Sequence, residues 1–298
     1  MSSTYLDPNL ARVLPLAHSG SDDAYYDYCL EPYRPRRPWE GKYRSENLLW
    51  HSLLVAGADA VLGPPMRAVQ SALGLDLTVW GVKWDGARLW WELYFYDPRK
   101  EDPNATLTSV ARVLAPWLRF APKIDERWPY MMVSFDLDAD VIARGRVDDV
   151  SLYLTGETGH AGRAYELSAR GPELTNTYRF LEAKREVDQV LALVEASVFV
   201  DWSRRETLAK VIPPQLWACK KICVAKKRRA DGIYFSGITV EQLLWFFRRF
   251  SYPAPLVAFV AQHEAKFEHL FFDVGIDYRW DTDKNELVTT KSSYYGTF

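Results

Sequence analysis

The sequence predicts an α+β protein in which ten antiparallel strands, arranged as five hairpins, close into a β-barrel surrounded by helices. Three observations predict this fold: pairs of strand-like segments alternate with amphipathic helical segments, turn motifs join paired strands, and aliphatic residues alternate with tyrosines along several strands. Alternation with a period of two indicates a sheet with one apolar face. Closure would remove the exposed strand edges. An open antiparallel sheet with helices on one face is the alternative.

The composition is that of one large globular domain. The chain has 298 residues, 48% hydrophobic and 26% charged, and includes 17 tyrosines, 14 phenylalanines and 12 tryptophans. A chain of this length buries roughly 75% of its unfolded surface without disulfides or metals. No low-complexity linker divides residues 44–298, so we predict a single barrel domain there. Residues 1–43, rich in proline, tyrosine and charge, are predicted to form an extended arm on the surface of that domain.

The helical segments are marked by apolar residues at helical spacing. The clearest is 182–200, where apolar residues fall on one stripe: Val187, Val190, Leu191, Val194 and Val198. The motif Thr239-Val-Glu-Gln242 predicts a capped helix start. The other predicted helical segments are 45–62, 64–73, 107–120, 240–250 and 255–268.

The five predicted hairpins lie between these helices. Asp85-Gly86 and Arg170-Gly171-Pro172 are turn signals. The basic run from Lys226 to Arg229 precedes Asp231-Gly232, and we interpret it as a solvated hairpin tip. The paired strands are 77–84 with 89–96, 131–137 with 150–155, 164–169 with 174–180, 220–226 with 232–236, and 270–280 with 286–295.

The second strands of the hairpins separate two kinds of aromatic residue. In the first hairpin Trp91, Leu93 and Phe95 share one face, while Glu92 and Tyr94 share the other. We predict that the apolar face packs against the helices and that the other face lines a lumen wide enough for a small ligand. The tyrosines predicted to line this lumen are Tyr94, Tyr153, Tyr178, Tyr234 and Tyr294.

Charge and cysteine content disfavour several classes of protein. The net charge is −2, whereas a nucleic-acid-binding protein usually has a basic excess. The spacings of Cys29, Cys219 and Cys223 support neither a disulfide framework nor a zinc site, and we predict no metal-binding residues. The N-terminal residues lack a signal-peptide pattern, and no stretch approaches the length of a membrane helix. We therefore expect a cytoplasmic protein, and a monomer, with no nucleic-acid or membrane partner.

Two short motifs resemble those of a known family. Val133-Ser-Phe-Asp-Leu137 is followed by Val150-Ser-Leu-Tyr-Leu154, and Val82-Lys-Trp-Asp85 is followed by Trp91-Glu-Leu-Tyr-Phe95. Together with the repeated helix and hairpin order, they resemble the soluble aromatic prenyltransferases of the ABBA type. The resemblance covers residues 45–298. It implies transfer of an allylic prenyl group from a prenyl diphosphate to a small aromatic molecule in the lumen, and it leaves open whether Mg²⁺ accompanies the diphosphate.

The resemblance also implies functional residues. In that family, lysines and arginines hold the diphosphate and tyrosines shield the allylic cation. The positions two residues before the tyrosines, where a cation is expected, hold Glu92, Ser151, Asn176 and Gly232. The cations must then come from other positions, and the candidates are Lys83, Lys221, Arg279 and Lys291.

The expected catalytic carboxylates are Glu92 and Asp136, which would orient the acceptor and take up a proton. The alternative function is a non-catalytic barrel that binds a hydrophobic or aromatic ligand or a partner protein. An enzyme of this type needs at least two cations that converge at one end of the lumen within reach of a carboxylate.

Overall fold

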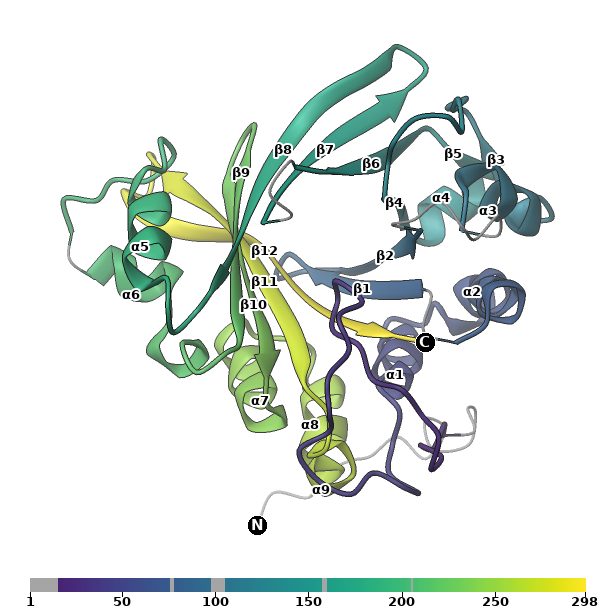
Figure 1. The fold of residues 1–298 in the computed structure, drawn as a ribbon, viewed down its shortest axis with the longest axis horizontal. Coiled ribbons are helices and arrows are strands. Elements are labelled where there is room, and N and C mark those ends of the chain that lie inside the picture. The colour runs from purple at the N-terminus through teal and green to yellow at the C-terminus, as the bar shows by residue number, and fades with distance from the viewer. Residues whose placement is uncertain (1–15, 76–77, 98–104, 157–159, 205) are drawn as a thin grey trace.

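A computed structural model of the chain describes residues 16–75, 78–97, 105–156, 160–204 and 206–298. The predicted strand residue Leu77 and the first 15 residues of the predicted arm lie outside these ranges. Among the described residues, ten antiparallel strands form a closed barrel in the order β1-β12-β11-β10-β9-β8-β7-β6-β4-β2 (Figure 1). The predicted barrel is therefore confirmed, and the open sheet is excluded.

Each of the five hairpins lies where it was predicted, with bounds that differ by a few residues. Two short strands, β3 (Arg119–Phe120) and β5 (Arg146–Val147), pair in parallel outside the barrel. The barrel strands are β1 (Thr78–Trp84), β2 (Leu89–Tyr96), β4 (Met132–Leu137), β6 (Asp149–Thr155), β7 (Ala161–Ser168), β8 (Gly171–Glu182), β9 (Lys221–Lys227), β10 (Asp231–Ile238), β11 (Phe272–Asp281) and β12 (Glu286–Thr297).

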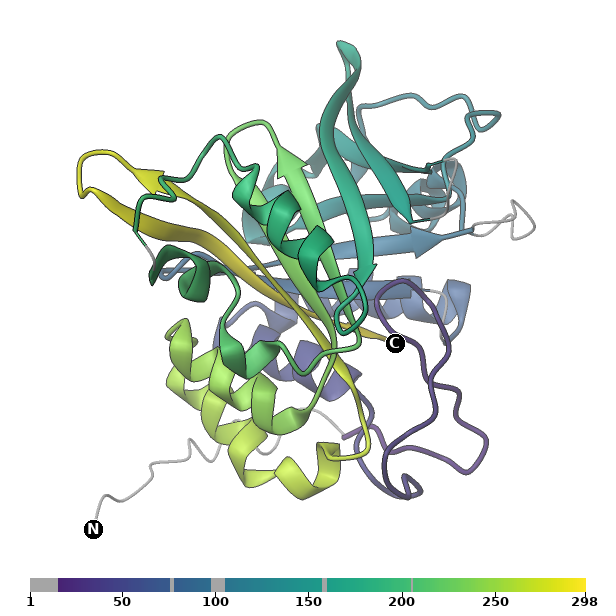
Figure 2. The ribbon, with the colours of Figure 1, turned by 60° about the vertical axis from the view of Figure 1, so that its left-hand side comes forward.

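The helices lie outside the barrel (Figures 1 and 2). A 3₁₀ turn spans Pro214–Leu216. The α-helices are α1 (Glu46–Val55), α2 (Asp59–Leu73), α3 (Leu107–Leu114), α4 (Ala139–Arg144), α5 (Val187–Glu195), α6 (Glu206–Val211), α7 (Val240–Arg249), α8 (Ala254–Gln262) and α9 (Glu264–Phe267).

Helix boundaries depart from the predicted ones for local reasons. Helix α7 begins at a capping box formed by Thr239 and Gln242, as predicted. Helix α5 is shorter than the segment 182–200 at both ends. Strand β8 continues to Glu182, which pairs with Lys221 in the barrel. The helix ends at Glu195, so Val198, predicted on its apolar stripe, lies beyond it and is exposed. The break expected before Pro64 lies instead at Gly57, whose φ of 65° favours glycine.

The apolar core lies between the barrel and the helices. Trp80, Trp91, Phe95 and Phe235 are almost fully buried there. The indole N–H of Trp91 donates to the Ser52 hydroxyl of α1 over 2.8 Å, which joins the barrel to this helix. The prediction that tryptophan and phenylalanine side chains pack on the helix side is confirmed for these residues. None of the helices in the described part of the chain is long and apolar enough to cross a membrane.

Candidate functional site

Five tyrosines form a layer across the inside of the barrel. Strand alternation points each of them inward, and each comes from the second strand of a different hairpin. Four neighbouring pairs of rings have centroids 6.0 to 6.3 Å apart: Tyr94–Tyr153, Tyr94–Tyr295, Tyr153–Tyr178 and Tyr234–Tyr295. Burial raises the pKa of each phenol, so all five are neutral at physiological pH. We call them the tyrosine layer: Tyr94, Tyr153, Tyr178, Tyr234 and Tyr295.

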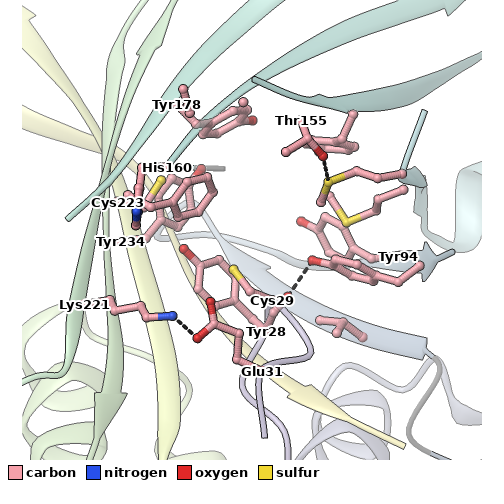
Figure 3. Close-up of a pocket in the computed structure, with 18 of the residues that line it drawn as sticks. Tyr28, Cys29, Glu31, Tyr94, Thr155, His160, Tyr178, Lys221, Cys223 and Tyr234 are labelled. Atoms are coloured by element: carbon pink, nitrogen blue, oxygen red, sulfur yellow. Dashed lines mark hydrogen bonds and ion pairs between the residues drawn. The ribbon is translucent and has the colours of Figure 1, made fainter. Parts of the chain in front are cut away.

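A cavity of about 610 Å³ lies on one side of the tyrosine layer. Its base consists of the five tyrosine rings, and its walls include apolar side chains such as Met132 and Phe180. Figure 3 shows Tyr94, Tyr178 and Tyr234 bordering this space from different strands, and Tyr28, on the arm, reaching into it. The size and the aromatic lining suit an apolar or aromatic small molecule.

The tyrosine hydroxyls point away from the cavity, toward a polar floor of the lumen. The Tyr94 hydroxyl donates to Glu92 over 2.5 Å, and the side-chain amide of Asn176 donates to the Tyr178 hydroxyl over 2.8 Å. The remaining three hydroxyls bond to other floor side chains: Ser134, Lys227 and Ser293. The rings therefore separate an apolar cavity from a charged floor.

One part of the floor carries a net negative charge. The Lys83 ammonium lies 2.6 Å from a Glu92 oxygen and 2.5 Å from an Asp136 oxygen. Register explains this contact, because Glu92 and Asp136 are direct cross-strand partners on β2 and β4, and Lys83 shares their face on β1. We call these three residues the acidic cluster. Two carboxylates and one ammonium give it a formal charge of −1.

Glu92 is held by three side chains of the floor. It accepts hydrogen bonds from Ser134 and Tyr94, each 2.5 Å long, in addition to its contact with Lys83. Burial alone would raise the pKa of Glu92, but Lys83 and these hydroxyls lower it. Burial alone would lower the pKa of Lys83, but Asp136 and Glu92 raise it. Both groups are therefore charged at neutral pH.

The other part of the floor carries a net positive charge. Asp277 on β11 lies between two lysines, 2.6 Å from the Lys227 ammonium and 3.0 Å from that of Lys291. We call these three residues the basic cluster, and their formal charge is +1. Burial alone would raise the pKa of Asp277, but the two lysines hold it well below its usual range. Burial lowers the pKa of Lys227 to about 8; Asp277 opposes this shift and Lys291 reinforces it.

The floor is open to water on its outer side. The Asp136 side chain is 53% exposed, whereas those of Lys83 and Glu92 are each 9% exposed. Lys291 is intermediate, at 20%. A charged group can therefore approach the two clusters from this end of the barrel without crossing the apolar cavity.

Four of the five predicted lumen tyrosines lie in the tyrosine layer, and the fifth does not. Tyr294 points to the helix side, where its ring packs against that of Phe247 on α7, with the two ring centroids 4.9 Å apart. Its neighbour Tyr295 takes the place in the lumen. The pairing of β12 with β1, in which Tyr295 lies opposite Gly81, determines which tyrosine faces inward. The space above Gly81 accommodates the Tyr295 ring, because any Cβ there would clash with it.

The predicted carboxylates Glu92 and Asp136 lie together on the floor, but the predicted cations fall in three places. Lys83 and Lys291 reach the two floor clusters. Lys221 lies on the cavity side of the tyrosine layer and forms an ion pair with Glu31 of the arm. Arg279 lies two residues beyond Asp277 on the same strand, β11, but its side chain is exposed and belongs to neither floor cluster.

Lys227 is a floor cation that sequence reasoning missed. It belongs to the basic run interpreted as a solvated hairpin tip, but β9 continues through it, and its side chain is only 13% exposed. A usable signal was present in the sequence, since Cys223, Ala225 and Lys227 alternate on one face of β9. Lys226 points outward instead and pairs with Asp231.

The floor carboxylates do not fit a resident metal ion. Within the described ranges, no three His, Cys, Asp or Glu side chains come close enough to hold one. Glu92, Asp136 and Asp277 each contact a lysine, which competes with a metal cation for their oxygens. Cys29, Cys219 and Cys223 are free thiols.

Comparison with known proteins does not identify a family or a function for the chain. No model of a known protein family matches the chain, and no curated protein gives a significant match.

Proposed function

We propose that the protein is an aromatic prenyltransferase that joins an allylic group to an aromatic small molecule inside the barrel. The observation that carries this proposal is the order of layers in the lumen. The tyrosine layer lies between an apolar cavity and a floor on which Lys227 and Lys291 converge beside the Asp277 carboxylate. This order matches the needs of a reaction that separates an anionic leaving group from a carbocation.

The basic cluster supports binding of the diphosphate. Its two lysines share one carboxylate, so they retain a net positive charge and free N–H donors for phosphate oxygens. The allylic chain would then run from the floor past the tyrosine rings into the apolar cavity. The aromatic acceptor would lie on the floor side of the layer, beside the Tyr94 hydroxyl. Tyrosine rings attract a cation over their faces, by about 2 kcal/mol or more when the site excludes water.

The reaction breaks the C–O bond of the allylic diphosphate, and the electron pair leaves with the diphosphate. A carbon of the acceptor ring attacks the allylic cation to form the new C–C bond. The proton displaced from that ring carbon passes to the Tyr94 hydroxyl, while the Tyr94 proton moves to Glu92, which it already contacts. A carboxylate with a lowered pKa is a sufficient base because the protonated ring is a strong acid. Before the proton arrives, ionised Glu92 also stabilises the cationic intermediate.

Product formation tests the proposal. The purified protein is incubated with dimethylallyl or geranyl diphosphate and a panel of phenols and indoles, with and without Mg²⁺. We expect release of inorganic diphosphate, together with a prenylated aromatic product. Glu92→Gln should reduce turnover by about 10²- to 10⁴-fold, the usual contribution of a general base. Binding of a prenyl alcohol as tightly as its diphosphate, without any transfer, would instead favour a non-catalytic barrel.

The alternative function, a non-catalytic barrel that binds a ligand, rests on one observation. All three floor lysines already have carboxylate partners, so the floor is electrically balanced without a ligand. A non-catalytic protein would use the cavity alone to hold a hydrophobic or aromatic ligand. It would bind a prenyl alcohol as tightly as the corresponding diphosphate, because no charge is then recognised.

Affinity for the diphosphate should fall as the pH rises from 7 to 9. Lys227, with a pKa of about 8, is charged below this pH and becomes neutral above it. Phosphate groups complete their ionisation near pH 6, so the ligand charge is constant over this range. We expect the dissociation constant for geranyl diphosphate to rise by up to about tenfold, measured by calorimetry. In Lys227→Met this pH dependence should disappear, and its persistence there would assign it to another group.

A further inference from the structure

A turn of the N-terminal arm, residues 27–31, enters the barrel on the cavity side of the tyrosine layer. Asp27 closes the turn, because its Oδ1 accepts the backbone N–H groups of Cys29 and Glu31 over 2.9 and 3.0 Å. Leu30 has a φ of 55°, a left-handed conformation that is uncommon for leucine. The turn is therefore compact, and it projects Tyr28 into the lumen (Figure 3).

The barrel holds the backbone of Tyr28 from two sides. Its N–H donates to Asp273 of β11 over 2.8 Å, and its carbonyl accepts a hydrogen bond of 2.5 Å from the Tyr96 hydroxyl of β2. A third contact is the ion pair between Glu31 and Lys221 of β9. These anchors come from different strands around the barrel. Together they hold the turn in the lumen and determine its position there.

The Tyr28 ring extends the tyrosine layer into a wall. Its centroid is 6.3 Å from that of Tyr234, with the rings nearly parallel, and 5.6 Å from that of Tyr295. The ring therefore covers one side of the layer. The cavity extends on the other side, toward Tyr153 and Tyr178.

We propose that Tyr28 is a specificity-determining residue that limits the length of the apolar ligand in the cavity. This inference rests on the ligand-binding part of the proposed function and does not require prenyl transfer. Removing the phenol ring would open the side of the lumen above Tyr234 and Tyr295, a space comparable to one five-carbon isoprene unit. A longer ligand would then bury more apolar surface.

The test uses the full chain and four isoprenoid alcohols of 5, 10, 15 and 20 carbons, which carry no diphosphate. Each alcohol displaces the fluorescent dye 1-anilinonaphthalene-8-sulfonate from the wild type and from Tyr28→Ala. We expect the preferred alcohol to lengthen by one isoprene unit in Tyr28→Ala, with affinity for the longer alcohol rising about tenfold. The matched control is Tyr26→Ala, the same truncation on the same arm at a residue that does not line the cavity. It should retain the wild-type preference.

An unchanged preference in a folded Tyr28→Ala protein would overturn the proposal, as would failure of every alcohol to displace the dye. If Tyr28→Ala does not fold, Tyr28→Leu should lengthen the preferred alcohol in the same direction, and no change in it would overturn the proposal. A change in the preferred alcohol length without any prenyl transfer would support the role of Tyr28 and contradict the enzymatic function. Failure of this inference can therefore be told apart from failure of the proposed function.

Discussion

Replacing Lys227 with methionine should weaken the binding of geranyl diphosphate by about 10- to 100-fold. The variant keeps the aliphatic stem but removes an ammonium that can donate charge-assisted hydrogen bonds to phosphate oxygens, each contributing about 1.5 to 3 kcal/mol. The fold should tolerate the change because Asp277 retains its ion pair with Lys291. Titration calorimetry at pH 7, where Lys227 is charged, measures the effect.

Lys221→Met is the matched control, because this lysine lies on the cavity side of the tyrosine layer rather than on the floor. We expect the affinity of this variant for geranyl diphosphate to stay within about threefold of the wild type. An exposed ion pair such as that of Lys221 contributes less than about 1 kcal/mol. Larger losses in Lys221→Met than in Lys227→Met would move the diphosphate site to the mouth of the barrel and contradict the assignment of the basic cluster.

Replacing Lys83 with methionine should destabilise the protein by about 3 kcal/mol. Removing one partner of a buried ion pair typically costs about 3 to 5 kcal/mol because the remaining charge is left without compensation. The lower end applies here, since the Asp136 side chain is 53% exposed and water screens its charge. Glu92, by contrast, is 9% exposed and faces Asp136 across the β2–β4 ladder. Urea denaturation measures the free energy of unfolding.

The double variant Lys83→Met, Glu92→Gln separates charge from packing. Neutralising Glu92 removes the uncompensated charge, so the double variant should recover at least half of the lost stability. Additive losses in the two single variants would show that Lys83 acts through packing alone. The pH dependence gives a second check. Lys83 lowers the pKa of Glu92, so this stabilisation is present above the ordinary carboxyl pKa and is lost as the pH falls through the lowered value.

The barrel and most of the tyrosine layer could be predicted because both depend on local alternation. Strand-like segments and turn motifs located the five hairpins, and the alternation in three of the second strands identified Tyr94, Tyr153 and Tyr234. Tyr178 was also predicted, although its strand matches the alternation poorly. The fifth member could not be found this way. In the run Ser-Ser-Tyr294-Tyr295 either tyrosine can face inward, and only the pairing of β12 with β1 and β11 decides between them.

The charges of the floor were harder to predict because they depend on contacts between distant strands. Lys227 belongs to a run of four basic residues, and its burial follows from the extension of β9 beyond the point where composition suggests a turn. The pairing of each lysine with a carboxylate depends on register across β1, β2 and β4, or across β9, β10, β11 and β12. The arm was predicted to lie on the surface. Its turn reaches the lumen through single hydrogen bonds to Asp273 and Tyr96, for which the sequence has no periodic signal.

The central claim is that the lumen recognises an allylic chain and its diphosphate together. Titration calorimetry of the wild-type protein with geranyl diphosphate and with geraniol, with and without Mg²⁺, tests it most directly. We predict one saturable site at which the diphosphate binds at least about 100-fold more tightly than the alcohol, as two charge-assisted contacts to Lys227 and Lys291 require. Equal affinities for the two ligands, or no binding of geranyl diphosphate under either condition, would contradict the claim.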